Sequence, residues 1–351
     1  MMEALVLHGI GDLRLEKIPV PHLAEGEVRV RIGFCGVCGS DIPRIFVKGT
    51  YSFPTVCGHE FAGIVDACGP GVNDFAPGDA VAVFPLLWCG KCSACEQGKY
   101  VQCCDYDYLG SRSNGAFAEF VVAPRQNLIP VPQGVTLEEA SMTEPAAVAL
   151  HALRRIQTSL AGKTVAIFGA GPIGLMTAQW ARIMGVAEIF LFDIIAEKLE
   201  LAQRIGFDNI FNSATEDPIK IINARTDGKG AHACIEAAGV PATYRHALGS
   251  VGRGGSVVFL GNPDADVTLP AVLISQLMRR EVSILGTWNS DYSAAGNDDD
   301  WRTVLQAIAS GMLTLTPLIT HKIPLADSSD MLHKMWDKSE FYAKVLIHPA
   351  L

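Results

Sequence analysis

Four cysteines in one short stretch could hold a metal ion. The stretch CGKCSACEQGKYVQC, residues 89–103, has the spacing C-x2-C-x2-C-x7-C. Thiolates two residues apart can converge on one tetrahedral Zn²⁺ ion, and the longer arm can close the cage. Four thiolates fill the coordination shell of zinc and leave no position for a substrate. We therefore predict a structural zinc site formed by Cys89, Cys92, Cys95 and Cys103.

The same stretch could instead form disulfides, hold an iron–sulfur cluster or act as a zinc knuckle for nucleic acid. The N-terminus shows no basic segment followed by a long apolar one, so we expect no signal peptide, a cytoplasmic protein and reduced thiols. A net charge of −9 and the lack of a Lys/Arg cluster argue against nucleic acid as a partner. Structural zinc is therefore favoured, and Cys104 is expected to be a spare thiol.

A second group of ligand-type residues predicts a catalytic metal. Cys38 lies in CGVCGSD and His59 lies in CGHEFAG. A thiolate, an imidazole, one carboxylate and a water would form an open zinc site with room for a substrate. The residue types leave two candidates for the carboxylate. Glu60 is adjacent to His59, while Glu144 precedes Pro145, which disfavours helical geometry at Glu144 and presents its side chain at the start of a helix.

The segment GAGPIG, residues 169–174, predicts a dinucleotide site. It follows the apolar run TVAIF and opens a helical pattern, as the Rossmann fingerprint requires. The glycines allow a tight turn and a close approach of the pyrophosphate, and the helix N-terminus supplies free N–H groups. Asp193 can accept hydrogen bonds from the ribose and repel a 2′-phosphate, so NAD is favoured over NADP; a Rossmann sheet without cofactor is the alternative. The predicted cofactor contacts are Gly169, Gly171, Pro172, Ile173, Gly174 and Asp193.

The elements that must position these residues change in type near residue 145. Short alternating segments at 27–32, 63–68, 79–84 and 115–123 predict strands of a β-rich domain, whose loops hold the candidate ligands. After a helix predicted over 144–156, apolar strands alternate with helices, which predicts a parallel, doubly wound sheet. The segment YAKVLIHP near the C-terminus has a strand pattern and is expected to return to the first domain.

Composition agrees with an enzyme of about two domains. The chain has 351 residues, of which 49% are hydrophobic and 19% are charged. No apolar run approaches the roughly 18 residues needed to cross a bilayer, so we expect no membrane partner. We expect a catalytic domain over 1–150, a nucleotide-binding domain over 151–287 and a return to the first domain over 288–351.

Taken together, the motifs resemble the zinc-dependent medium-chain dehydrogenase/reductase family. The run GHEFAGIVDACGPGV, residues 58–72, is similar to the family signature G-H-E-x2-G-x5-G-x2-V. The CGxCGSD segment, the four-cysteine lobe, the TEP segment at 143–145 and GAGPIG occur in the family's order, and the resemblance covers essentially the whole chain. It implies an α/β plus β fold, in which a GroES-like β-rich catalytic domain carries an inserted Rossmann domain, with the active site and NAD in the cleft between them.

The resemblance also implies roles for residues of the catalytic zinc site. Cys38, His59 and Glu144 match its ligands, and Glu144 in place of a second cysteine is typical of the polyol (sorbitol-like) branch. Glu60 matches an alternate or water-mediated ligand. Asp41 would orient His59.

A proton relay is implied as well, with one departure from the family. Ser40 matches the hydroxyl that begins the relay. Many relatives carry His two residues after the aspartate that follows this serine, where this chain has Pro43. Water would therefore have to replace a relay that ends on histidine.

The implied reaction is zinc- and NAD-dependent oxidation of a secondary hydroxyl of a sugar alcohol or sugar-alcohol phosphate to a ketose. Within the family, the runs CGSDIPRIF, GTYSFPTVCGHEFAG and YDYLGSRSNGAFAEF resemble those of enzymes that act on galactitol 1-phosphate, and this resemblance implies that substrate. A phosphate needs cationic partners, and the candidates are Arg44, Lys48 and Arg112. The resemblance further implies two zinc ions per chain and a homodimer or homotetramer.

Three alternatives to this function remain open at the level of sequence. The first is an unphosphorylated polyol dehydrogenase of the sorbitol or xylitol type. The second is a threonine- or butanediol-type dehydrogenase. The third is a non-catalytic NAD- and zinc-binding scaffold, which the retained Cys38, His59 and glycines disfavour.

Overall fold

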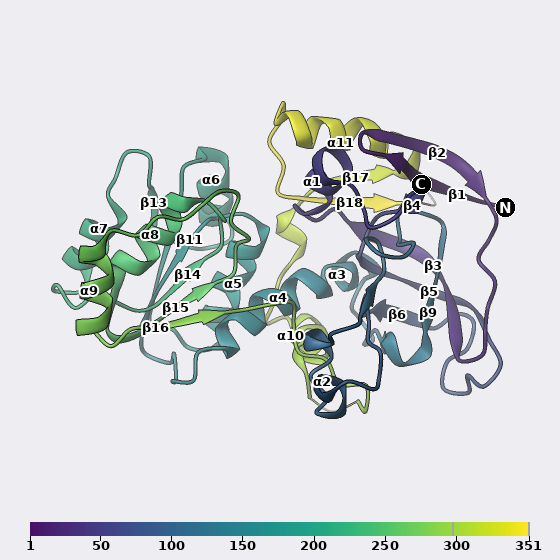
Figure 1. Cartoon of the computed structure of the whole chain (residues 1–351), viewed down its shortest axis with the longest axis horizontal. Helices are drawn as coiled ribbons and strands as arrows, with labels where there is room; N and C mark the ends of the chain where they lie inside the picture. Colours follow the sequence, from purple (N-terminus) through teal and green to yellow (C-terminus); the bar gives the residue numbers. More distant parts are fainter. Residues whose placement is uncertain (297, 350–351) are drawn as a thin grey trace. The chain divides into compact units, whose positions relative to one another are not determined.

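The computed structural model describes residues 1–296 and 298–349. The chain divides into two compact units, which we call unit 1 (Met1–Pro145 with Asp291–Leu351) and unit 2 (Ala146–Ser290). Unit 1 therefore joins the two ends of the chain, purple to blue and yellow in Figure 1, around the segment that forms unit 2. The chain passes between the units near residues 145 and 290. The domain boundaries expected from the sequence pattern were residues 150 and 287.

Unit 1 is built mainly of antiparallel strands. Its largest sheet has the order β10-β6-β5-β3-β18-β17, with β9 also paired to β3. Smaller sheets have the orders β2-β1-β4 and β7-β8. The strands are β1 (Met2–Gly9), β2 (Asp12–Ile18), β3 (Glu27–Gly36), β4 (Thr55–Val56), β5 (Glu60–Cys68), β6 (Ala80–Val83), β7 (Leu86–Leu87), β8 (Asp107–Tyr108), β9 (Phe120–Pro124), β10 (Leu128–Pro130), β17 (Ile319–Pro324) and β18 (Lys344–His348).

The helices of unit 1 are short and lie mostly between strands. They include the capping box at α3, in which Thr136 and Glu139 satisfy each other's backbone N–H groups. The helical segments are α1 (Asp41–Pro43), η1 (Arg44–Lys48), α2 (Ser93–Glu96), η2 (Tyr100–Gln102), η3 (Arg125–Asn127), α3 (Leu137–Ser141), α4 (Thr143–Arg154), α10 (Asp300–Ala309), η4 (Thr316–Leu318), η5 (Leu325–Asp327) and α11 (Ser328–Asp337), with α4 continuing into unit 2.

Alternation of apolar residues explains the core of unit 1. In β3, Val28, Val30 and Ile32 are at most 1% exposed, because successive side chains point to opposite faces of a strand. The C-terminal β18 pairs with β3 through Leu346 and Gly36, which places the end of the chain in unit 1. In Figure 1 the yellow β18 accordingly belongs to the same unit as the purple β3. This pairing brings the end of the chain to the loop that follows β3.

Two local predictions differ from the structure. The strand predicted over 115–123 is shorter, since β9 begins at Phe120. Residues before it instead bond to the loop before β5, with the N–H of Ala116 donating to the Gly58 carbonyl at 2.9 Å. Glu144 lies inside the first turn of α4, not outside helical geometry. A proline in the first turn removes no helical hydrogen bond, so the helix tolerates Pro145, and the steric preference of the preceding residue for an extended backbone does not prevail.

Unit 2 is the doubly wound parallel sheet that the sequence predicts. Its strand order is β13-β12-β11-β14-β15-β16, and all neighbouring pairs are parallel. Helices pack on the sheet (Figure 1), with α5 against β11 and β12 and α8 against β14. The elements are β11 (Thr164–Phe168), α5 (Pro172–Ile183), β12 (Glu188–Asp193), α6 (Ala196–Arg204), β13 (Ile210–Asn212), α7 (Pro218–Arg225), β14 (Ala231–Glu236), α8 (Pro241–Ser250), β15 (Val251–Phe259), α9 (Ala271–Arg279) and β16 (Ser283–Gly286).

Burial in unit 2 follows from the parallel arrangement. Val165, Ala166, Ile167 and Phe168 of β11 are all fully buried, as expected for a strand covered on both faces. Among the described residues, no helix has both the length and the apolar character needed to cross a membrane.

Candidate metal sites, active site and nucleotide site

The four cysteines of the opening stretch converge on one point. One Sγ atom from each of Cys89, Cys92, Cys95 and Cys103 lies within 4.8 Å of all the others. Cys92 and Cys95 are separated by 3.5 Å between sulfurs, and the N–H of Cys89 donates to Cys103 Sγ at 3.3 Å. Four thiolates at this spacing fit the tetrahedral four-cysteine ligand set of a structural zinc site. We refer to this group as the closed site.

The local backbone of the closed site favours thiolates. The short helix α2 starts within the stretch, directly after Cys92. Backbone N–H groups, first that of Cys95, lower the pKa of Cys92 to about 6. The N–H of Lys91 is the main cause of a lowered pKa at Cys89. Cys95 is the exception, because burial raises its pKa to about 12. A bound cation would favour the thiolate at every position.

A second group of ligand atoms lies in unit 1. Cys38, His59 and Glu60 each place one ligand atom within 4.8 Å of the other two. Cys38 lies in the loop between β3 and α1, and His59 and Glu60 lie at the start of β5. Gly58 precedes them with φ +93°, and a Cβ there would lie 2.5 Å from the Phe117 ring, so only glycine fits. A thiolate, an imidazole and a carboxylate leave a coordination position for a substrate.

Asp41 organises this second group, which we call the open site. Its buried carboxylate accepts the N–H of Cys38 at 3.0 Å and the Arg44 guanidinium at 2.6 Å. Asp41 Oδ1 lies 3.4 Å from His59 Nδ1, an electrostatic contact longer than a normal hydrogen bond. Burial disfavours protonation of His59, but the Asp41 carboxylate outweighs it and raises the pKa of His59 well above its usual value. Asp41 thus holds the Nδ1 side of the ring and leaves Nε2 for a metal.

The predicted third ligand, Glu144, lies outside the group of three close ligand atoms. Its Oε1 accepts the Tyr108 hydroxyl at 3.2 Å, and the Tyr108 ring packs edge-on against His59 with centroids 5.8 Å apart. Burial raises the pKa of Glu144 to about 7, and the charge of Glu60 adds to this effect against the opposing attraction of His59. Glu60, predicted as the alternate ligand, is the carboxylate that the structure groups with Cys38 and His59.

Tyr108 and Lys344 are site residues that the sequence reasoning missed. Lys344 begins β18, is buried, contacts the Glu60 carboxylate and donates to the Val37 carbonyl at 3.3 Å. Burial alone would lower the pKa of Lys344, but Glu60 raises it above its usual value, so the ammonium stays charged. A lysine directly before the buried run VLI was the signal that could have revealed it, because lysine is rarely buried without a partner.

The relay residues lie beside the open site. Ser40 is exposed, and its Oγ donates to Cys38 Sγ at 3.3 Å. Pro43 ends α1. The structure therefore places the Ser40 hydroxyl next to a candidate metal ligand and next to solvent.

The three cationic candidates for a phosphate differ in their surroundings. Arg44 is paired with Asp41, and Lys48 is exposed at the end of η1. Arg112 lies between two tyrosines, with its guanidinium carbon 4.3 Å from the ring centroids of both Tyr51 and Tyr106. Arg112 and its two tyrosines line a cavity of about 570 Å³, which neither of the other two cations borders.

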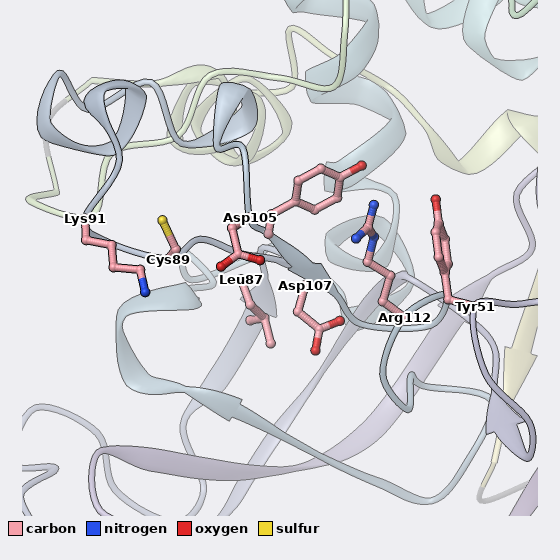
Figure 2. Close-up of a pocket in the computed structure, with 8 residues that line it drawn as sticks. Tyr51, Leu87, Cys89, Lys91, Asp105, Asp107 and Arg112 are labelled. Carbon is pink, nitrogen blue, oxygen red and sulfur yellow. The ribbon is translucent and has the colours of Figure 1, made fainter.

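Figure 2 shows this cavity, which also receives Cys89 and Lys91 of the four-cysteine stretch. In this view, the carboxylates of Asp105 and Asp107 lie between Lys91 and Arg112. A series of ring contacts runs from the cavity to the open site. The Tyr106 ring lies 6.5 Å from that of Tyr108, which in turn packs on His59.

The glycines of GAGPIG occupy the turn between β11 and α5. Gly169 has φ +112°, and a Cβ there would lie 2.9 Å from the Ala238 nitrogen. A Cβ on Gly174 would clash with the Gly169 carbonyl, so both positions require glycine. Gly171 is the N-cap of α5, followed by Pro172 and Ile173 in the first turn, and has open space beside it. The free N–H groups of the first helical turn can bind a pyrophosphate.

Asp193 ends β12 beside this turn. Its Oδ2 accepts the N–H of Ala170 at 2.8 Å, and its Oδ1 accepts the N–H groups of Ile194 and Ile195. Lys198 Nζ lies 3.8 Å from Asp193 Oδ2 and is a further candidate for contact with a ribose. Asp193 thus fixes the loops around the nucleotide turn as well as presenting a negative charge there.

Comparison with known proteins gives matches over both units. Residues 24–133 match the family model of the alcohol dehydrogenase GroES-like domain, and residues 172–310 match that of the zinc-binding dehydrogenase. The chain is 36% identical over 322 residues to galactitol 1-phosphate 5-dehydrogenase of Escherichia coli strain K12, with 92% of each chain covered. It is 31% identical over 355 residues to sorbitol dehydrogenase of Bacillus subtilis, covering 99% of this chain and 97% of that protein.

A solved structure also matches closely. The crystal structure of galactitol-1-phosphate dehydrogenase from Escherichia coli has a TM-score of 0.93 at 35% identity, covering 99% of this chain and 100% of that one. Together with the two family models, this match confirms the predicted fold class, a GroES-like domain with a Rossmann domain.

Proposed function

The chain belongs to the zinc-dependent medium-chain dehydrogenases, a family of oxidoreductases, and from this membership we propose that it oxidises a secondary hydroxyl of a polyol phosphate to a ketose with NAD as acceptor. Galactitol 1-phosphate is the favoured substrate. The observation that carries the proposal is the open site, where Cys38, His59 and Glu60 converge beside an exposed Ser40 hydroxyl. The sequence predicted this family and enzyme class, and both are confirmed.

In this proposal, residues of unit 1 hold the metal and move the proton. Cys38 and His59 bind zinc, with a carboxylate from Glu60 or Glu144, and Asp41 fixes the imidazole. When bound, zinc acts as a Lewis acid on the substrate hydroxyl, and the nicotinamide accepts a hydride. Ser40, exposed next to Cys38, takes the hydroxyl proton and passes it to water, since Pro43 offers no acidic or basic group.

Arg112 supports the phosphorylated form of the substrate. A phosphate needs a charge-assisted hydrogen-bond partner, and Arg112 presents its guanidinium to a cavity, stacked between two tyrosine rings. The ring contacts from Tyr106 through Tyr108 to His59 connect that cavity to the open site. Arg44 is the weaker candidate, because Asp41 already engages it.

The test is NAD reduction against matched substrates. We expect galactitol 1-phosphate to be oxidised more efficiently than galactitol, sorbitol or xylitol, and L-threonine and 2,3-butanediol to be poor substrates. Equal efficiency on phosphorylated and free polyols would contradict the phosphate and favour a sorbitol-type enzyme, a function supported by the similarity to sorbitol dehydrogenase. No turnover of any of these substrates by the zinc-loaded protein would favour a scaffold.

The choice of NAD over NADP rests on Asp193 in this proposal. Its carboxylate repels a 2′-phosphate and can accept from the ribose, although Lys198 lies 3.8 Å away and partly offsets its charge. Asp193→Asn keeps one of the two acceptor oxygens that bind loop N–H groups and removes the charge. We expect it to lower efficiency with NAD by about 1 kcal/mol and to improve efficiency with NADP relative to NAD. A wild-type preference for NADP would contradict the assignment.

We also propose a homodimer or homotetramer built through unit 2. Among the described strands, β16 pairs with β15 only and leaves an edge. Ile284 on this strand is 47% exposed and nearby Trp288 is 59% exposed. An apolar edge strand is a ready surface for pairing with a second copy. Light scattering should show a dimer or tetramer that Ile284→Lys weakens, and a monomeric wild type would contradict the proposal.

A further inference from the structure

We propose that Lys344 is a positioning residue of the open site, whose ammonium keeps Glu60 an exchangeable ligand and so prevents four protein groups from closing the metal's shell. The inference rests on the proposed function, because it requires a metal bound by Cys38 and His59.

Lys344 and Glu60 form a buried ion pair at the edge of the site. The Lys344 side chain is 3% exposed and that of Glu60 is 2% exposed, and Nζ contacts Oε2 directly. Lys344 also donates to the Val37 carbonyl at 3.3 Å. Burying an ammonium costs several kcal/mol unless it is paired, so this lysine is held here by Glu60 and by the carbonyl.

The fold makes room for this pair. Gly36 lies opposite Leu346 where β3 pairs with β18. A Cβ at Gly36 would lie 2.9 Å from Lys344 Cε and would clash with Glu60 Oε2. The backbone of Gly36 does not have a positive φ, so space rather than conformation requires glycine at this position.

Charge explains what the pair does. The site contains four acidic side chains, those of Cys38, Asp41, Glu60 and Glu144. One of them, Asp41, is already paired with Arg44. Lys344 and a divalent cation compete for the charge of Glu60, and they repel each other strongly in buried surroundings. Glu60 held on one oxygen by the ammonium is a weaker ligand than a free carboxylate.

The consequence concerns the substrate position. Four protein ligands would fill the coordination shell of the metal, as the four cysteines would in the closed site. In the open site these four would be Cys38, His59, Glu60 and Glu144. With Lys344 drawing Glu60 away, one position can be given to the substrate hydroxyl. Without it, Glu60 would bind permanently, giving tighter metal binding and less room for substrate.

The experiment measures zinc release to a chromogenic chelator from protein loaded with both zinc ions, with the closed-site zinc as internal reference. We expect Lys344→Met to release the open-site zinc about tenfold more slowly than wild type, a factor that corresponds to about 1.4 kcal/mol. Lys344→Arg should behave as wild type because it keeps the charge. The matched control is Lys322→Met, which removes a lysine that bonds Glu138 at 2.7 Å in the same unit.

A merely structural role for Lys344 predicts the opposite result. Loss of a structural contact would speed zinc release and lower Tm by similar amounts with and without the open-site zinc. The proposal instead predicts that reloading this zinc raises Tm more in Lys344→Met than in wild type, because the metal takes over the neutralisation of Glu60. Unchanged or faster release would overturn it.

Two further measurements keep the inference testable if Lys344→Met folds poorly. Lys344→Gln removes the charge but keeps a donor that can bond the Val37 carbonyl, and it should also slow zinc release. Cobalt substituted at the open site should show shifted d–d bands in either variant, as expected when a carboxylate replaces the exchangeable fourth ligand; unchanged spectra in both would count against the proposal. Wild type that holds only the closed-site zinc would contradict the proposed function, whereas two zinc ions with unaltered variants would contradict this inference alone.

Discussion

The closed site takes all four of its donors from residues 89–103, whereas the open site gathers its groups from β3–α1, β5, α4 and β18. In the closed site, backbone N–H groups lower the pKa of Cys92 to about 6 and that of Cys89 below its usual value. In the open site, burial raises the pKa of Glu144 to about 7. Local backbone thus stabilises the thiolates of two closed-site cysteines, although burial opposes the thiolate of Cys95, while burial in the packed open site disfavours the charged form of Glu144.

This difference suggests different roles for the two sites. A metal in the closed site would stabilise the fold, whereas the open site depends on a fold that is already stable. The closed site belongs to a lobe with little apolar core, although Trp88 stacks on Tyr100 with centroids 4.2 Å apart. A metal there contributes folding free energy directly. The open site lies against the main core of unit 1, so a metal bound there would not be needed to hold the fold and could serve the proposed chemistry.

The largest effects should come from removing one ligand from each site. We expect His59→Ala to lose one zinc, to lose about three or more orders of magnitude in kcat because the several kcal/mol supplied by a Lewis acid are lost, and to keep its fold. Cys92→Ser should lose the other zinc and lower Tm by roughly 10 °C.

Metal analysis, kcat and thermal unfolding of both variants check this pair. Cys104→Ser is the matched control for the closed site, since Cys104 is exposed beside the cluster but is not among its four donors. A single zinc ion per chain in fully loaded wild type would contradict the distinction between a structural and a catalytic zinc site.

The next effect concerns the cavity that borders the closed site through Cys89 and Lys91. We expect Arg112→Ala to lose about 1.5–3 kcal/mol of kcat/KM on galactitol 1-phosphate, the value of a hydrogen bond to a charged group, and to leave free polyols unaffected. Arg125→Ala removes an arginine from an exposed pair with Asp74 and serves as control. Equal losses of kcat/KM on phosphorylated and free polyols would mean that Arg112 has a structural role and does not bind the phosphate.

The same contrast shows what sequence could predict. The four cysteines, the GAGPIG turn and the alternating patterns are local, and each predicted its structure because the physical cause lies within a few residues. The grouping of Cys38 with His59 was predicted from their ligand-type side chains on loops of one domain, and the resemblance to the family supported it. Tyr108 and Lys344 were missed, because no local pattern links Lys344 on β18 to Glu60 on β5.

The error at Glu144 and the missed partner of Arg44 also have physical reasons. Glu144 lies within the helix despite Pro145, because a first-turn proline costs no helical hydrogen bond and its steric effect on the preceding residue is a preference that the helix overrides. Arg44 stays a predicted phosphate partner, but its pairing with Asp41 at 2.6 Å was not foreseen from the sequence. Partners of charged side chains depend on tertiary packing, which a single sequence does not display.

A third prediction compares how ligands of the two sites affect stability. In protein depleted of the open-site zinc, the raised pKa of Glu144 means that ionising it costs free energy in the folded state. The folded state binds more protons than the unfolded state between about pH 4.5 and 7, so this contribution to stability is lost as pH rises through that window. We expect Glu144→Gln to be more stable than wild type at pH 8 by about 1–3 kcal/mol, and no more stable at pH 4.

Denaturant unfolding across that pH range checks this expectation. Glu138→Gln, in α3 where Glu138 pairs with Lys322, is the control and should not show the same gain. If Glu144→Gln is less stable than wild type at pH 8, the fold favours the charged form of Glu144. Glu144 would then resemble Cys89 and Cys92 of the closed site, whose charged forms the backbone favours.

The smallest expected effect comes from Tyr108→Phe. The Tyr108 hydroxyl donates to Glu144 at 3.2 Å and favours its ionised form, while the ring packs on His59. Phenylalanine keeps the ring contact and removes one hydrogen bond, so we expect kcat/KM to fall by about 0.5–1.5 kcal/mol with both zinc ions retained. Because the hydrogen bond lowers the pKa of Glu144, its loss should move the pH-dependent change in stability of the zinc-depleted protein to higher pH. Tyr100→Phe, which keeps its stacking on Trp88 in the closed-site lobe, should change neither quantity. If Tyr108→Phe instead lost the open-site zinc, Tyr108 would be required to assemble the site, and the open site would depend on its immediate neighbours as much as the closed site does.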